Sequence, residues 1–158
     1  ETLETAPSQN MVPKDTRFGI VIPKIGVNSL IHKETDWQDS GVYQEALRTG
    51  VAHAKGTSTP DKPGNVFLFA HSGIDFYEAL RYNAEFYLVN KLEPGDRLSL
   101  YYEGNQYVYH VREGRIVEPD AVDYLLTDNT SSTVTLMTCW PPGTTAKRQL
   151  IIADRIEE

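Results

Sequence analysis

Apolar side chains alternate with polar ones in several short runs along the chain, a pattern typical of β-strands that bury one face. The first run begins with Phe18, Ile20 and Ile22. The segment 97–117 predicts a hairpin, because two alternating runs join at a polar turn around 103–105. Further strands are predicted at 27–31, 65–71, 133–139 and 148–156.

Helical patterns are few and short. A short helix or turn is predicted within 35–50, stopped by Gly50, and short helical pieces within 73–92. Pro119 can begin another short helix. Its apolar face would hold Val122, Leu125 and Leu126. Without repeats or long helices, the pattern predicts a mostly β barrel or sandwich with small helical inserts.

Length and charge narrow the choice of class. The 158 residues suit a single domain, with 1–16 as a polar linker or tail and 17–158 as the folded domain. The net charge of -7 argues against nucleic acid as a partner. No apolar run approaches the roughly 18–20 residues that span a bilayer. Because the chain begins with Glu1, we expect a fragment whose membrane anchor lies in a segment outside it.

The single cysteine, Cys139, is the first candidate for chemistry. It ends the strand predicted at 133–139 and precedes the loop WPPGTTAK. A buried structural thiol is the simpler interpretation, but a position at a strand end favours function. If the strand pairs antiparallel with the next run, Cys139 faces Arg148. A guanidinium there could stabilise an oxyanion, whereas Lys147 is interpreted as a solvated charge.

A cysteine nucleophile needs a proton-transfer partner, and the chain offers His32, His53, His71 and His110. His71 has the best position, because it closes the predicted strand 65–71 as Cys139 closes its own. Any of the four could be structural instead. No zinc-ligand spacing, P-loop or serine elbow is present in the sequence, so no metal site and no cofactor are expected.

Several segments together resemble the sortases, the cysteine transpeptidases of bacterial cell surfaces. TLMTC, at 135–139, resembles the TLxTC signature of this family, and RFGIVIPKIGV resembles its opening strand. GVAHAKGTSTPDKPGNVFLFAHS resembles the segment with the catalytic histidine, and RQLIIADRI the strand opened by the catalytic arginine. The resemblance covers about residues 17–156.

The resemblance implies a closed, roughly eight-stranded barrel and assigns roles by position. Cys139 would be the nucleophile, His71 the general acid and Arg148 the oxyanion stabiliser. Thr138 matches a threonine that often lines the site in this family, and the Trp140 backbone N–H could help to bind the oxyanion. Sortases cleave an LPXTG-like signal between Thr and Gly, and pass the acyl chain through a thioester to an amine.

The resemblance also implies partners and a location. The donors would be surface proteins with an LPXTG-like signal, and the acceptor a cell-wall precursor or a pilin lysine. The enzyme would lie on the extracellular face of the bacterial membrane. The proline-containing segment after Cys139 favours a class D-like subclass, and no acidic loop identifies a calcium site. A silent binding module with the same fold, or a cysteine hydrolase that uses water, remain alternatives.

Overall fold

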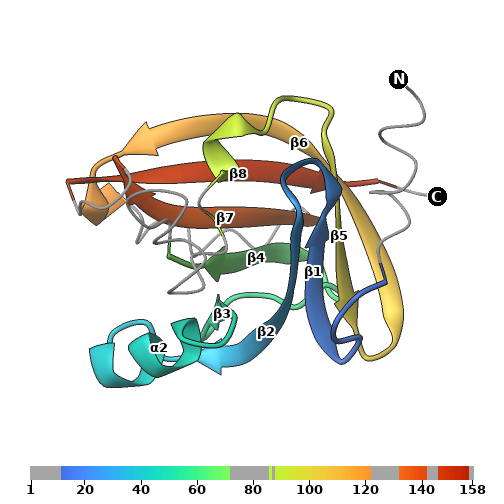
Figure 1. The fold of residues 1–158 in the computed structure, drawn as a ribbon, viewed down its shortest axis with the longest axis horizontal. Helices are drawn as coiled ribbons and strands as arrows, with labels where there is room; N and C mark the ends of the chain where they lie inside the picture. Colours follow the sequence, from blue (N-terminus) through green and yellow to red (C-terminus); the bar gives the residue numbers. More distant parts are fainter. Residues whose placement is uncertain (1–11, 72–85, 87, 122–131, 142–145, 157–158) are drawn as a thin grey trace.

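Eight strands form a closed barrel in the computed structural model, which describes residues 12–71, 86, 88–121, 132–141 and 146–156 (Figure 1). The strands are β1 (Phe18–Ile22), β2 (Val27–Thr35), β3 (Val51–Ala54), β4 (Gly64–Phe69), β5 (Arg97–Tyr102), β6 (Asn105–Val117), β7 (Ser132–Trp140) and β8 (Lys147–Arg155). The helical elements are the 3-10 turns η1 (Pro23–Ile25), η2 (Val89–Lys91) and η3 (Pro119–Ala121), and the helix α2 (Ser40–Leu47). The predicted β-barrel is therefore confirmed.

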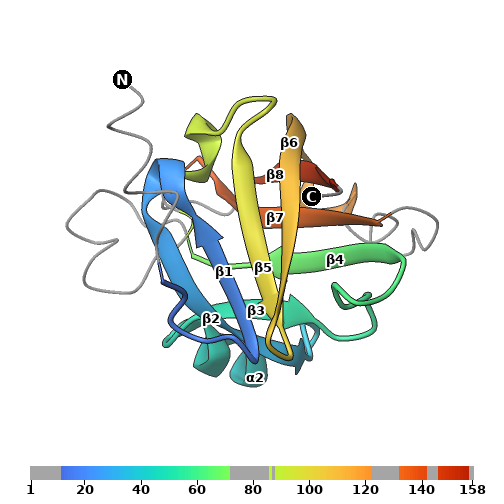
Figure 2. The same ribbon diagram turned by 90° about the vertical axis from the view of Figure 1, so that its right-hand side faces the viewer.

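The strand order around the barrel is β1-β2-β3-β4-β7-β8-β6-β5, and β5 returns to pair with β1. Figure 2 shows β1, β5 and β6 crossing in front of β4, β7 and β8. Most neighbours are antiparallel, but β2 and β3 are parallel, and so are β4 and β7, which are far apart in sequence. This parallel pair places the carboxyl ends of two distant strands at the same edge.

The β5–β6 hairpin has a tight two-residue turn. Tyr102 pairs with Asn105, so only Glu103 and Gly104 form the loop. Both have positive φ, 50° and 86°, the conformation that a type I′ turn requires. The predicted hairpin is confirmed, with Asn105 already inside β6.

The helix predicted within 35–50 is confirmed as α2, which ends at Leu47, before Gly50. Gly50 has a packing role instead, because a Cβ there would lie 2.7 Å from the Leu30 carbonyl oxygen. β3, at 51–54, was not predicted from the sequence. It is only four residues long, and it exists because β2 and β4 pair with it on either side.

The apolar positions of the alternating runs meet in one core. Its fully buried members include Ile20, Leu68, Leu100, Leu136 and Ile151. Burial of such side chains is the main stabilising term of a domain of this size. The predicted apolar positions 122, 125 and 126, and most of 73–92, lie outside the described residues.

Residues just before β1 already contact the barrel. The Asn28 side chain binds the Val12 carbonyl at 2.8 Å and the Lys14 backbone N–H at 2.9 Å. The carbonyls of Thr16 and Arg17 accept from the β5–β6 turn. Among the described helices, none combines the length and the hydropathy of a membrane span.

Candidate active site

Cys139 and Arg148 lie opposite each other at one end of the antiparallel pair β7–β8. Cys139 pairs with Arg148, and the next pair, Trp140 with Lys147, is the last before the connecting loop. The register predicted from the sequence for Cys139 and Arg148 is therefore confirmed. Directly opposed residues of an antiparallel pair point to the same face, so the thiol and the guanidinium share one face of the sheet.

His71 follows the end of β4, the other neighbour of β7. Asn65 pairs with Thr133 and Phe69 with Met137, so each β4 residue lies opposite the β7 residue 68 positions later. The Ala70 N–H extends this pairing by donating to the Met137 carbonyl at 3.2 Å. The same register continued by one further residue places His71 beside Cys139.

The three predicted residues therefore belong to the ends of three adjacent strands. Side chains alternate along a strand, so Met137 and Cys139 share a face, and the alternation of β4 continued to His71 gives that residue the face of Phe69. Phe69 pairs with Met137, so the face of Phe69 on β4 and the face of Met137 and Cys139 on β7 are the same face of the sheet. Arg148 lies on this face as well, because it pairs with Cys139. The barrel thus brings a thiol, an imidazole and a guanidinium to one edge and one face.

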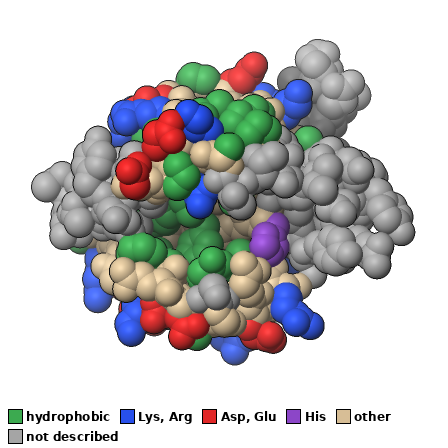
Figure 3. Space-filling view, turned by 90° about the vertical axis from the view of Figure 1, so that its left-hand side faces the viewer, with side chains coloured by type: hydrophobic (Ala, Val, Ile, Leu, Met, Phe, Trp, Pro, Cys, Tyr) green, Lys and Arg blue, Asp and Glu red, His purple; other side chains and the backbone are tan. Residues whose placement is uncertain are grey.

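The surface at this end of the barrel is partly apolar. Figure 3 shows hydrophobic side chains in a hollowed area, bordered by a histidine and by a basic side chain. On the same strand face, Phe69 is buried and makes an edge-on ring contact with Tyr43 of α2, with 6.0 Å between the ring centroids. Apolar surroundings strengthen electrostatic interactions among the polar groups that they enclose.

The titratable groups of the site are half-buried. Burial lowers the pKa of His71 below its ordinary value of 6.5, because desolvation penalises the imidazolium form. The backbone of His71 is held in place, since its carbonyl accepts from the Phe86 N–H at 3.0 Å. The lowered pKa favours the neutral form of the imidazole at neutral pH.

Arg148 is fixed at the start of β8 by its own neighbourhood. Its Nη1 donates to the Lys147 carbonyl at 3.1 Å, and Lys147 forms an ion pair with Glu118. Glu118 directly follows β6, so this ion pair joins the end of β6 to the start of β8. Lys147, interpreted from the sequence as a solvated charge, therefore has an ionic partner.

Thr138 and Trp140 flank Cys139, so their side chains begin on the strand face opposite to it. Thr138 is only 3% exposed, and its hydroxyl donates to the Ala70 carbonyl at 2.8 Å. Trp140 is half-buried and ends β7, and a cis peptide bond joins it to Pro141. The rest of the loop, 142–145, lies outside the described residues.

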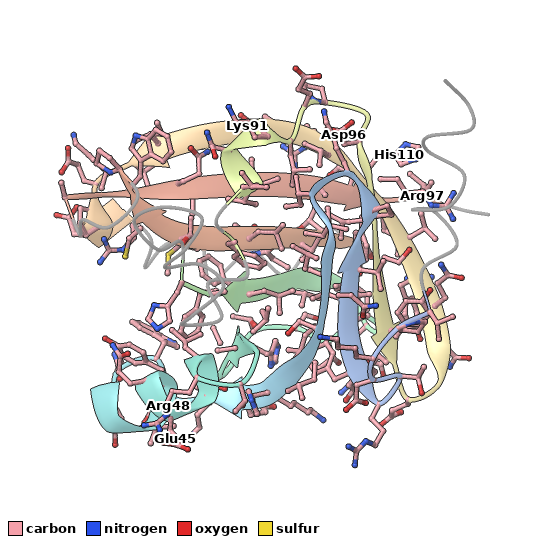
Figure 4. The ribbon with its side chains drawn as sticks, in the orientation of Figure 1. Glu45, Arg48, Lys91, Asp96, Arg97 and His110 are labelled. Atoms are coloured by element: carbon pink, nitrogen blue, oxygen red, sulfur yellow. The ribbon has the colours of Figure 1, made fainter. Side chains whose placement is uncertain are left out.

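The other three histidines have separate surroundings. His53 is fully buried, with Nδ1 accepting from the Glu34 N–H at 3.0 Å and Nε2 lying 2.8 Å from the Ser58 carbonyl. His32 contacts the Thr49 hydroxyl at 2.8 Å. Figure 4 shows His110 near Asp96 and Arg97, away from the end of the barrel where β4 and β7 finish. The same view shows Glu45 and Arg48 on α2, and Lys91 above β8.

Some contacts of the site could not be read from the sequence. The Thr138–Ala70 hydrogen bond depends on the long-range pairing of β4 with β7, and the Glu118–Lys147 ion pair on the pairing of β6 with β8. The described residues contain no group of three or more His, Cys, Asp or Glu side chains arranged to hold a metal ion.

Comparison with known proteins identifies the family. Residues 20–156 match the sortase domain, and the chain belongs to the sortase family. Sortase D of Bacillus subtilis (strain 168) is 28% identical over 138 residues, which cover 85% of this chain and 61% of that protein. The chain thus spans about three fifths of the length of this relative.

Solved structures agree with the fold. Sortase C-1 from Actinomyces oris has a TM-score of 0.75 and 29% identity, covering 92% of this chain and 77% of that one. The pilus-related sortase C of Group B Streptococcus has a TM-score of 0.74 and 29% identity, with coverages of 92% and 70%. Sortase A from Corynebacterium diphtheriae shares the fold at 22% identity, with a TM-score of 0.74 and coverages of 95% and 64%.

Proposed function

We propose that residues 17–158 form the catalytic domain of a cysteine transpeptidase, joined by the linker 1–16 to a segment that anchors it to the membrane. The substrate is the LPXTG-like sorting signal of a surface protein, and the product is an amide between that protein and an amine. Family membership supports this proposal. The observation that carries it is the arrangement of Cys139, His71 and Arg148 on one face at the ends of three adjacent strands.

In the first half-reaction, the Cys139 thiol gives its proton to His71, and the resulting thiolate attacks the carbonyl carbon of the signal threonine. Arg148 and the Trp140 backbone N–H stabilise the oxyanion that forms, because pre-positioned donors favour the transition state over the planar amide. The bond to the glycine nitrogen then breaks, and His71 gives its proton to this leaving amine. The products are a thioester between Cys139 and the threonine carbonyl, and a released carboxyl-terminal fragment that begins with glycine.

In the second half-reaction, an amine attacks the thioester carbonyl. His71, neutral after the first step, accepts the proton of the attacking amine, and Cys139 leaves as a thiolate. An unprotonated amine is a far better nucleophile toward a thioester than water is, so an amide is the favoured product. The imidazole therefore works in opposite directions in the two steps, as an acid in the first and as a base in the second.

The relatives and the residues after Cys139 support finer assignments. The 28% identity to Sortase D supports a class D-like subclass, as does the proline-containing loop. The acceptor would be a cell-wall precursor or a pilin lysine, and the domain would act on the extracellular face of the membrane. No cofactor and no metal take part in the proposed steps.

The test is incubation of the protein with LPXTG-like peptides and an amine such as oligoglycine or a diamine. Products are identified by mass spectrometry, with Cys139→Ala as the matched control. The proposal predicts a new amide whose share of the product rises with amine concentration, while the free acid falls. Free acid alone, formed in a Cys139-dependent way, would show a hydrolase. No cleavage together with an unreactive thiol would show a silent binding module.

A further inference from the structure

Thr138 precedes the nucleophile, yet its contacts point away from a substrate. The residue is 3% exposed, and its side chain leaves β7 on the face opposite to that of Cys139. Its hydroxyl donates to the Ala70 carbonyl at 2.8 Å. A buried hydroxyl already committed to a backbone acceptor has little to offer to an incoming peptide.

The acceptor of this bond directly precedes the catalytic histidine of the proposed mechanism. β4 ends at Phe69, so His71 lies beyond the regular strand. The Ala70 peptide is held to β7 at both of its polar groups, since its N–H donates to the Met137 carbonyl and its carbonyl accepts from Thr138. On the far side, the His71 carbonyl accepts from the Phe86 N–H at 3.0 Å.

We infer that Thr138 is a positioning residue, whose hydroxyl fixes the backbone before His71 in register with Cys139. This inference rests on the proposed function. Thr138 acts through Ala70 and does not touch the substrate. The hydrogen bond joins Thr138 to Ala70, the residues directly before Cys139 and His71. Loss of this bond therefore alters the distance between the Cys139 and His71 side chains. Misplacement of a reacting group by about 1 Å can lower a rate by about 100-fold.

The experiment compares Thr138→Val with Thr138→Ser. Valine keeps the shape and burial of threonine but lacks the hydroxyl, whereas serine keeps the hydroxyl and loses a methyl group. The matched control is Thr135→Val, because Thr135 is also buried in β7 and its hydroxyl donates to the Asn65 side chain at 2.9 Å, away from His71. All variants are first checked for folding by thermal unfolding.

Steady-state kinetics with an LPXTG-like peptide and an amine give the first result. Thr138→Val should lower kcat by about 10- to 100-fold with KM changed by less than about 2-fold, because alignment is lost and binding is not. Thr138→Ser should recover most of kcat, and Thr135→Val should leave it unchanged. An increase in KM with kcat retained would show that Thr138 contacts the substrate and would overturn the inference.

The imidazole titration of His71, followed by NMR, tests the same inference without turnover. Thr138→Val should move the His71 titration midpoint toward 6.5, because a less firmly held ring is better solvated, and Thr138→Ser should not. If the wild-type protein forms no amide, the proposed function fails while this titration still decides the role of Thr138. An unchanged His71 titration in Thr138→Val would overturn the inference.

Discussion

Replacement of His53 by leucine should lower the free energy of unfolding and leave the catalytic activity unchanged. His53 is fully buried in β3, and its ring accepts from the Glu34 N–H and donates to the Ser58 carbonyl. It pairs with Leu68, which lies on the strand face opposite to Phe69 and hence to His71. The ring therefore stabilises the barrel from a position that the site does not use.

The size of this loss of stability follows from two backbone groups, the Glu34 N–H and the Ser58 carbonyl, which lose their hydrogen-bond partner in His53→Leu. Each buried group left without a hydrogen bond costs about 1–3 kcal/mol, so the two together cost about 2–6 kcal/mol. Ser58 is half-buried and can recruit water, which favours the lower part, about 2–4 kcal/mol. The Thr57 hydroxyl adds little, because it keeps its bonds to the Ala54 carbonyl and the Phe67 N–H.

Urea unfolding measures this loss directly. With a slope of about 2 kcal/mol per molar urea, the midpoint of His53→Leu should fall by about 1–2 M. His53→Gln should lose less, because its amide can both donate and accept. kcat in the absence of urea should stay close to the wild-type value in both variants. Loss of turnover in a folded His53→Leu protein, with turnover retained in His71→Gln, would refute the assignment of the two histidines.

The same variant should change how stability depends on pH. Burial lowers the pKa of His53 below its ordinary value of 6.5, so the unfolded chain binds the proton more readily. Stability contributed by the neutral ring is complete above pH 6.5 and is lost as the pH falls through the folded pKa. Lys33 and Glu34 act on this ring with opposite signs. In His53→Leu the acid-side decline in unfolding free energy should be shallower; an unchanged slope would contradict the argument.

Further predictions concern the other charged groups. Arg148→Lys should lower kcat by about 100-fold although the charge is kept, because an ammonium group cannot replace the planar donors of a guanidinium. Arg155→Ala should remain active. An inactive Arg155→Ala protein together with an active Arg148→Lys protein would show that the catalytic arginine is Arg155. kcat/KM should have a bell-shaped pH profile with one limb below pH 6.5, from the lowered pKa of His71; both limbs above pH 7 would contradict this. Glu118→Gln, which removes an exposed ion pair with Lys147, should change the free energy of unfolding by less than about 1 kcal/mol in thermal melts; a loss of several kcal/mol would show that the pair holds β8 in place.

The sequence predicted those parts of the fold that depend on local pattern. The alternating residues of β1, β5 and β6 indicated strands, and so did the apolar runs of β7 and β8. The opposition of Cys139 and Arg148 could be predicted as well, since a single short loop connects their strands. Short connections leave few choices of register.

Long-range pairing could not be predicted in the same way. β3 is too short to show an alternating pattern, and it is stabilised by neighbours on both sides. The parallel register of β4 with β7 is not encoded in any local segment, yet it brings the end of β4, just before His71, to the end of β7 and lets Thr138 reach Ala70. Thr138 was therefore predicted to bind substrate on the resemblance alone, whereas its hydrogen bond indicates a positioning role.

The most direct test of the central claim is the mass of the intact protein during a reaction with an LPXTG-like peptide and no amine. The proposed mechanism predicts that the mass of the protein rises by the mass of the peptide fragment that ends in threonine, less one water. Peptide mapping should place the adduct on Cys139, and addition of oligoglycine should discharge it as an amide. An adduct on any other residue, or peptide cleavage by the Cys139→Ala protein, would contradict the account.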